Sequence, residues 1–335
     1  MRVIVASRVC WLLAAIAAVA GGAAPAAPPT GGEPPALYIA DPTAGPLVSG
    51  FPAKVEPQLV APWPRWFASA SGLVMTRTLP SGAVSTGPGS LSFDTQDASA
   101  SWPGGVDLRL GRWFGARQQH AIEMIYWGVY NIGSSTFAAA GADAGTLQRS
   151  DLVNDVEINW LASLGERPEF MADDQRVNWM WLGGFRFFQL QDDLTLVTLS
   201  PATDLDVATN NNLFGGQVGA KFDWAFAPRL RLSAVPKFMI GGNSITNTST
   251  FNGTSEHSTL GVFSWLGSVD TMVAWDVTER WSLWMGYRVV GVGNISQADQ
   301  QWPATIPPSA ADLSGVAAGS ESIVHGGFAG FEARY

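Results

Sequence analysis

Residues 214–226, FGGQVGAKFDWAF, alternate apolar and polar side chains with a period of two. One parity carries Phe214, Val218, Ala220, Phe222, Trp224 and Phe226, and the other carries Gln217, Lys221 and Asp223. Successive side chains of a strand point to opposite faces, so this segment predicts a strand with one apolar and one charged face. The pattern recurs along most of the chain without a long apolar run. That is typical of a membrane β-barrel, with lipid outside and water or ion pairs inside.

The amino-acid composition indicates that part of the protein surface contacts an apolar environment rather than water. The 335 residues could form one large all-β domain or two smaller ones. They are 47% apolar and only 14% charged, with 15 Trp, whereas a soluble domain usually carries about 25% charged residues. The net charge of −9 argues against a nucleic-acid partner, for which a basic stripe would be expected.

The N-terminal segment has the features of an export signal. Arg2 and Arg8 precede an apolar run from Val9 to Ala20, which is too short to span a bilayer. We predict a signal peptide at residues 1–20, with cleavage as late as residue 26, and a retained signal anchor as the alternative. Cys10, the only cysteine, lies inside this segment, so we expect no redox chemistry and no cofactor in the mature chain.

A proline-rich stretch separates this signal from the predicted barrel. Residues 21–64 are rich in Pro, Ala and Gly, and proline blocks the pairing of strands because it lacks an amide donor. We predict a periplasmic linker here, with a cell-wall tether or partner-binding peptide as the alternative.

Residues 65–335 are predicted to form a closed, antiparallel, up-and-down transmembrane β-barrel of about ten strands. The predicted strands are 66–75, 104–113, 120–131, 151–164, 176–190, 212–226, 229–241, 262–276, 280–293 and 322–335. Long connections (76–103, 132–150, 191–211, 242–261, 294–321) alternate with short ones, as in outer-membrane barrels. One misread hairpin would make twelve strands. We interpret Leu194–Leu199 as a hairpin extension above the membrane and 242–261 as a solvated loop.

The inward parity of these strands carries both acids and bases. They could pair across strands and lock the interior, or line a polar path for small solutes. About eight strands leave a filled interior and 16–18 leave a channel, so any pore through ten would be narrow. The predicted lumen-lining residues are Asp107, Arg109, Glu123, Asp155, Glu157, Asn159, Arg186, Gln217, Lys221, Asp223, Arg231, Lys237, Arg288, Glu332 and Arg334, with Asp270 on the same parity.

Aromatic residues gather near the strand ends, where amphipathic rings occupy the headgroup level of a membrane. We interpret as such girdles Trp66, Trp113, Tyr126, Trp127, Tyr130, Trp160, Trp179, Trp181, Trp224, Trp265, Trp275, Trp281 and Tyr287. The alternative, stacking platforms for sugars, would depend on Trp284, Phe188, Trp102 and Trp302.

Catalytic candidates are few. The chain has three histidines and no mature cysteine. His257, beside Glu256, Ser255 and Ser258, is the one local group that resembles the site of a rim hydrolase. A single loop histidine is usually only solvated, so we predict that the protein is not an enzyme and holds no metal.

Several segments together resemble the β-barrel porin family of planctomycete-type bacteria: WFASASGLVM, VDLRLGRWF, DVEINWLASL, WLGGFRFFQL, FGGQVGAKFDWAF and GGFAGFEARY. The resemblance covers roughly residues 63–335 and implies an outer-membrane barrel, without catalytic residues to carry over. The C-terminus resembles the signal for barrel-assembly machinery through Gly330 and the terminal Tyr335. It departs from that pattern at Ala333 and Phe328.

Together these features predict an integral, exported protein of the bacterial outer membrane that acts as a narrow passive pore for ions or small polar solutes. The alternative is a non-conducting structural or surface-interaction barrel whose extracellular loops bind partners. The expected partners of the protein are outer-membrane lipid, the barrel-assembly machinery and small solutes, and not nucleic acid.

Overall fold

A computed structural model describes residues 65–78, 82–87, 92–98, 100–115, 118–133, 135–140, 143–163, 177–199 and 202–335. All of them belong to one compact unit, Val60–Tyr335. The predicted signal peptide and linker lie outside the described residues.

The described chain is almost entirely strand. The strands are β1 (Trp66–Arg77), β2 (Val84–Thr86), β3 (Ser92–Asp94), β4 (Gly104–Phe114), β5 (His120–Tyr130), β6 (Ser135–Ala140), β7 (Asp143–Ser163), β8 (Val177–Leu199), β9 (Ala202–Ala227), β10 (Leu230–Phe251), β11 (Thr254–Asp276), β12 (Trp281–Ile295) and β13 (Ser320–Arg334). Three short helices join them: η2 (Thr95–Asp97), α2 (Ala298–Gln301) and α3 (Ala310–Leu313). None of the helices in the described part of the chain is long and apolar enough to cross a membrane.

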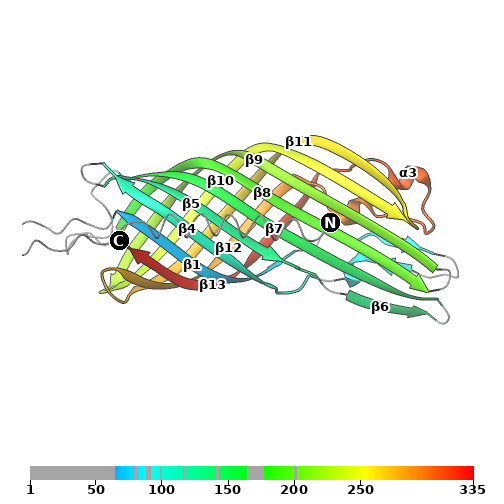
Figure 1. Cartoon of the computed structure of the whole chain (residues 1–335), viewed down its shortest axis with the longest axis horizontal. Coiled ribbons are helices and arrows are strands. Elements are labelled where there is room, and N and C mark those ends of the chain that lie inside the picture. Colours follow the sequence, from blue (N-terminus) through cyan, green and yellow to red (C-terminus); the bar gives the residue numbers. More distant parts are fainter. Residues whose placement is uncertain are drawn as a thin grey trace, which may run out of the picture. The chain divides into compact units, whose positions relative to one another are not determined.

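Ten strands close into an antiparallel ring (Figure 1). Each pairs with its neighbour in the order β5-β4-β1-β13-β12-β11-β10-β9-β8-β7, and β5 then pairs with β7, from His120 opposite Ala162 to Tyr130 opposite Leu152. β6 pairs only with the first part of β7 and stands outside the ring. Closure leaves no unpaired sheet edge toward lipid. The prediction of a closed barrel with ten strands is confirmed.

One end of the ring, which we call the short-turn end, carries tight turns such as that at Pro228 and Arg229 between β9 and β10. The opposite, long-hairpin end differs from the prediction. Residues 143–150, 191–199, 202–211, 242–251 and 254–261 are strand rather than loop, and Figure 1 shows β7 to β11 extending well past β1, β4, β5, β12 and β13. The solvated loop predicted at 242–261 is therefore wrong, whereas the hairpin extension at Leu194–Leu199 is confirmed.

The turn between β10 and β11 explains why that hairpin continues so far. Asn252 and Gly253 have φ angles of 45° and 82°, the left-handed conformations of a two-residue turn whose twist matches paired strands. Ladder pairing then runs without interruption from Phe251 opposite Thr254 down to Leu230 opposite Trp275. The Asn/Ser/Thr content of this segment reflects strands with solvated faces.

The two faces of the ring differ sharply in chemistry. Large apolar side chains cover the outer face, with Phe185 75%, Val218 66% and Phe214 60% exposed. Phe222 and Trp224, 43% and 48% exposed, lie on the same face, which excludes a sandwich in which this side packs inward. The inward parity holds the buried residues of both kinds, polar and apolar.

Rings and amides mark the edges of the apolar outer face. At the short-turn end, aromatic contacts join Phe114, His120 and Trp160, then Trp179, Trp181 and Phe222, then Trp281 and Phe331. Toward the long hairpins, a series of side-chain hydrogen bonds, which we call the amide ladder, joins Tyr126 to Asn154 (3.1 Å), Asn154 to Gln189 (3.1 Å) and Gln189 to Asn210 (3.2 Å). Strand segments beyond this ladder therefore lie outside the apolar band.

Two residues assigned to the girdles were placed wrongly. Trp127 is fully buried and Trp113 is 4% exposed, and both point into the barrel. They share the strand parity of Glu123 and Arg109 respectively, so parity decides their direction rather than residue type.

Candidate functional site

The barrel interior holds a compact group of ion pairs near mid-height. Arg288 of β12 donates from Nε to Asp270 Oδ1 (2.7 Å) and from Nη2 to Asp270 Oδ2 and Asp107 Oδ2 (both 2.8 Å). Arg109 of β4 donates to Asp107 (3.0 Å) and reaches Asp270 at 3.3 Å. The Arg288 guanidinium also lies over the Trp127 ring, 4.9 Å from its centroid.

A second group lies on β7, β8 and β10. Arg186 donates to Asp155 (2.7 Å), and Lys237 Nζ contacts both oxygens of Glu157 (2.6 and 2.9 Å). Gln217 and Asn159 each donate to Glu157 at 2.9 Å. The bond from Arg186 to Ser268 of β11 (3.0 Å) extends this group across the interior.

These two groups form what we call the ionic layer: Asp107, Arg109, Asp155, Glu157, Arg186, Lys237, Asp270 and Arg288. Four bases face four acids, so the layer carries no net charge. Each member except Arg109 is at least nine-tenths buried. Buried charges persist only when they are paired and hydrogen-bonded, and here the pairs join strands that are not neighbours, such as β4 with β11 and β7 with β10.

An apolar layer lies next to the ionic layer on the side of the long hairpins. It includes Met75, Val129, Phe188, Leu190, Met239, Leu266, Val290, Val292 and Val324, nearly all without solvent exposure. The charged and polar lumen residues that the sequence predicted therefore make up only part of the interior. Packed protein interiors leave few voids larger than a water molecule, and the members of the apolar layer are buried.

Beyond the apolar layer lies a second charged group, the outer ionic cluster of Arg77, Arg149, Asp151, Asp192 and Asp299. Arg77 contacts Asp151 at 2.6 Å and Asp192 at 2.7 Å, while Arg149 contacts Asp192 at 3.3 Å and also pairs with Asp299. This cluster stands past the amide ladder and outside the apolar band.

The pKa values of the two central carboxylates of the cluster are shifted in opposite directions. Burial, followed by the neighbouring charge of Asp192, raises the pKa of Asp151 well above its ordinary value in spite of Arg77. The pKa of Asp192 is lowered, because Arg77 and Arg149 together outweigh the effect of its burial. Asp192 is thus the carboxylate that the cluster holds ionised.

The segment between β12 and β13, residues 296–319, folds over this end of the barrel, and we call it the cap segment. Ala298 N donates to Asp192 (3.0 Å), and Asn211 exchanges two hydrogen bonds with the backbone of Ser296 (2.7 and 2.9 Å). Trp302, Ile306 and Leu313 of the cap segment pack in one buried cluster with Leu196 and Leu205 of the hairpins. The long-hairpin end is therefore covered.

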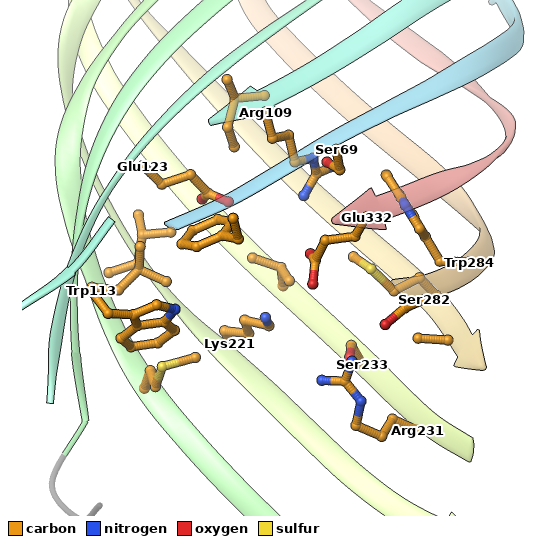
Figure 2. Close-up of a pocket in the computed structure, with 18 of the residues that line it drawn as sticks. Ser69, Arg109, Trp113, Glu123, Lys221, Arg231, Ser233, Ser282, Trp284 and Glu332 are labelled. Atoms are coloured by element: carbon orange, nitrogen blue, oxygen red, sulfur yellow. The ribbon is translucent and has the colours of Figure 1, made fainter. Parts of the chain in front are cut away.

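The short-turn end instead contains a cavity with a volume of about 70 Å³ (Figure 2). Side chains from all ten ring strands line it. Lys221, Glu123 and Glu332 point into it from separate strands, and Arg109 of the ionic layer forms part of its inner boundary. Phe67, Trp113, Leu161 and Met180 form one apolar wall.

The remaining predicted lumen residues surround this cavity. Asp276 accepts from both Arg231 (3.2 Å) and Arg334 (3.3 Å), and Arg334 also donates to Glu332 (2.8 Å). Lys221 lies 3.7 Å from Asp223, which accepts from Ser233. The predicted set therefore divides between the ionic layer and the cavity.

The two predicted assembly residues lie in β13 or just after it. A side chain at Gly330 would overlap the Ala70 carbonyl oxygen, at 2.2 Å, so this position needs glycine for close strand approach. Tyr335 is half exposed, and its backbone exchanges hydrogen bonds with Trp66.

Three of the candidate rim hydrolase residues, His257, Ser255 and Ser258, each contact a different residue outside the group. His257 lies on β11 with Nδ1 at 3.2 Å from Thr248 Oγ1, while Ser255 contacts Thr250 and Ser258 contacts Gly315 N. Among the residues that the structure describes, no group of three or more His, Cys, Asp or Glu is placed to hold a metal ion.

Sequence reasoning missed the outer ionic cluster. Arg77, Arg149, Asp192 and Asp299 fall in segments predicted to be connections. Asp151 shares the parity of Asp155 and Glu157, so following that alternation back through Val153 to the first residue of the predicted strand would have found it.

Comparison with known proteins identifies the fold but no family. No protein-family model matches, and no curated protein matches in sequence. The outer membrane protease OmpT from Escherichia coli aligns with a TM-score of 0.56 at 10% identity, covering 81% of this chain and 97% of that one. The toluene transporter TodX from P. putida (TM-score 0.31, 7% identity, 82% and 91% covered) and Neisserial surface protein A (0.26, 10%, 81% and 97%) align less well.

Of these three alignments, that with OmpT has a TM-score above 0.5, and at 10% identity it concerns the fold alone. The resemblance to planctomycete barrel porins stays a prediction. The chain has the fold of an outer-membrane β-barrel.

Proposed function

We propose that this protein resides in the bacterial outer membrane as a barrel closed to solutes, and that it acts through the surface of its long hairpins. This is the alternative that the sequence left open, and the packed interior now favours it over a passive pore. In the proposed orientation the short-turn end faces the periplasm and the cap segment faces outward, following the loop lengths of known barrels.

The observation that carries the proposal is the filled interior. The ionic layer, the apolar layer, the outer ionic cluster and the cap segment succeed one another along the barrel axis. Opening a path through the ionic layer would require separating buried charges, and each separated charge costs several kcal/mol.

The hairpins offer a broad surface for interaction. At and beyond the amide ladder, the outer face of β9 to β11 presents Asn210, Thr246, Thr248 and Thr259, together with the acids Asp204 and Asp206. Uncharged amide and hydroxyl groups both donate and accept hydrogen bonds, so they suit polar partners at the cell surface.

Planar bilayer recording of the purified, folded protein tests the proposal. We expect no stepwise conductance at neutral pH, with native folding verified by circular dichroism of the same sample. Stepwise openings whose ion preference changes on replacing Lys221 or Arg231 would instead support the narrow pore.

The narrow pore is the second candidate because the cavity at the short-turn end is lined by charged groups with partial solvent exposure, including Lys221 (29%) and Glu332 (27%). Such a cavity could serve as the entrance of a path that opens on rearrangement. OmpT is a protease, but at 10% identity the alignment concerns the fold alone, so we do not extend that activity to this chain.

A further inference from the structure

We propose that the exposed edge of β11 binds an extended, basic peptide segment of a partner protein as an additional strand. The edge consists of residues 255–261, which we call the free edge. The proposal deepens the surface role given above and rests on it, because the long hairpins must face outward to meet a partner.

The free edge exists because β11 is longer than β12. β11 pairs with β10 up to its first residue, whereas its pairing with β12 begins at Trp265, opposite Gly293. The side chain of Asn294 donates from Nδ2 to the carbonyl oxygen of Phe263 (2.6 Å) and covers β11 slightly further. Residues 255–261 therefore have β10 on one side and no described strand on the other.

Backbone groups of the free edge point away from β10 without a partner. The two-residue turn makes Phe251 and Thr254 a hydrogen-bonded pair, and such pairs alternate along an antiparallel ladder. The N–H and C=O groups directed away from β10 are those of Ser255, His257, Thr259 and Gly261. In the described part of the chain these groups have no hydrogen bond, and all four residues are exposed.

An unpaired row of backbone donors and acceptors is a template for another extended chain. Natural sheets protect such an edge with Lys, Pro or a bulge. The free edge has neither Lys nor Pro, and its ladder with β10 has no register shift. The cap segment contacts the inner face of β11, where Gly315 N donates to Ser258 Oγ (3.0 Å). The outward backbone groups of the free edge are thus accessible to a peptide.

Charge favours a basic peptide. Glu256 is the one charged residue of the free edge, and its side chain is exposed. Asp204 and Asp206 of β9 add negative charge to the same group of hairpins. The two arginines described at this end, Arg77 and Arg149, are both buried and paired with acids. A Lys or Arg on the added strand would therefore meet exposed acids without competing bases.

The inner face of the free edge gives the peptide a pattern. Glu256, Ser258 and Leu260 alternate along this face, and Leu260 is 36% exposed. Residues directly opposite one another in paired strands interact through their side chains. An antiparallel peptide would therefore place a basic residue opposite Glu256 and an apolar residue opposite Leu260. The heptapeptide Thr-Val-Thr-Thr-Thr-Lys-Thr has this pattern.

A second copy of this chain in the same membrane does not fit the free edge. Barrel strands tilt by about 35–45° from the membrane normal. The free edges of two copies that face the same way would therefore cross at about 70–90° rather than run antiparallel. Strands that cross so steeply cannot form a ladder of several residues.

Fluorescence anisotropy of the labelled heptapeptide, with the full-length protein in phosphatidylcholine nanodiscs, measures binding. We expect a Kd on the order of 100 μM. Methylating the two peptide amides opposite His257 and Thr259 should weaken binding at least about tenfold, because two backbone hydrogen bonds are lost. The isomer methylated opposite Glu256 and Ser258 has the same composition and should bind nearly as well as the unmethylated peptide.

Variants of the protein test the same contacts. Thr259→Pro removes an amide that β10 does not use, which an edge strand tolerates, and should weaken binding at least about tenfold. Thr259→Val keeps that amide and is the matched control, with affinity close to that of the natural protein. Glu256→Gln should weaken binding about two- to fivefold, and should not affect a peptide with Thr in place of Lys.

Equal binding of the two methylated isomers overturns the proposal, and so does the absence of saturable binding at millimolar peptide. Full affinity of folded Thr259→Pro also overturns it; if this variant does not fold, the two isomers decide. A dimer of the natural protein that Thr259→Pro dissociates would assign the edge to a second copy instead. Bilayer recording separates the two proposals. A silent barrel that binds no peptide refutes this inference alone, whereas a conducting barrel that binds the peptide refutes the closed barrel alone.

Discussion

Replacing Arg288 with methionine is the most direct test of the ionic layer. Methionine keeps a long flexible side chain next to Trp127 but removes the guanidinium that Asp107 and Asp270 share. Both carboxylates would remain buried, with Arg109 as their remaining cation at 3.0 and 3.3 Å.

The expected loss of stability follows from the contacts. Arg288 makes three charge-assisted hydrogen bonds of 2.7–2.8 Å, each of which contributes about 1.5–3 kcal/mol. Two effects reduce the sum. Arg109 still offsets part of the charge of the two buried carboxylates, and the guanidinium of Arg288 no longer has to be desolvated. We therefore expect the free energy of unfolding to fall by about 3–5 kcal/mol, the range for breaking a buried ion pair.

Reversible urea unfolding in phospholipid vesicles, followed by Trp fluorescence, measures this loss. Arg280→Met, which removes an exposed arginine, is the matched control and should stay within about 0.5 kcal/mol of the natural protein. The double variant Arg288→Met/Asp270→Asn should recover part of the stability, since it also removes one uncompensated carboxylate.

A loss below about 1 kcal/mol for Arg288→Met would refute the reasoning. That is the cost typical of solvent-exposed ion pairs, and it would mean that water fills the barrel at the level of Arg288. The closed-barrel proposal would then lose its main support, and the pore would become the better interpretation.

Three further predictions concern other parts of the barrel. Asp192→Asn should destabilise the protein by at least about 1 kcal/mol more than Asp151→Asn in urea unfolding. The lowered pKa of Asp192 favours its charged form, whereas the raised pKa of Asp151 favours the neutral form that asparagine mimics. Equal losses of stability would contradict this order. Val218→Arg, on the apolar outer face and 66% exposed, should cost about 2–4 kcal/mol in vesicles. Asn210→Arg, at the amide ladder that borders the apolar face, should cost at most about 1 kcal/mol. The reverse ranking would contradict the assigned position of the apolar band in the membrane. Deleting Tyr335 should reduce the amount of folded barrel in outer-membrane fractions, and undiminished levels would argue against the C-terminal assembly signal.

The ten ring strands could be predicted because their evidence is local. Residues 214–226 reveal an apolar and a charged face without reference to any partner, and the ring places Val218 and Phe222 outside and Gln217 and Asp223 inside. The same rule, applied strictly, places Trp113 and Trp127 inside. Ranking residue type above parity produced the error at these two positions.

The extent of the hairpins was less predictable. Residues 242–261 contain the polar residues of a loop, yet Asn252 and Gly253 supply a tight turn and the strands continue to it. Polar composition indicates that a segment is exposed to water. An extracellular loop and a solvated strand are both exposed in this way. It does not by itself distinguish the two backbones.

Sequence alone determined which side chains face lipid and which face inward, because a strand's alternation is a property of the backbone at each residue. Tertiary structure alone decided what the inward residues do. Arg288 and Asp107 meet across 181 residues of chain, and Arg77 joins Asp151 and Asp192 from strands that are not neighbours of its own. Whether inward charges line water or neutralise one another depends on distances across the ring, and those distances exist only after the barrel has closed.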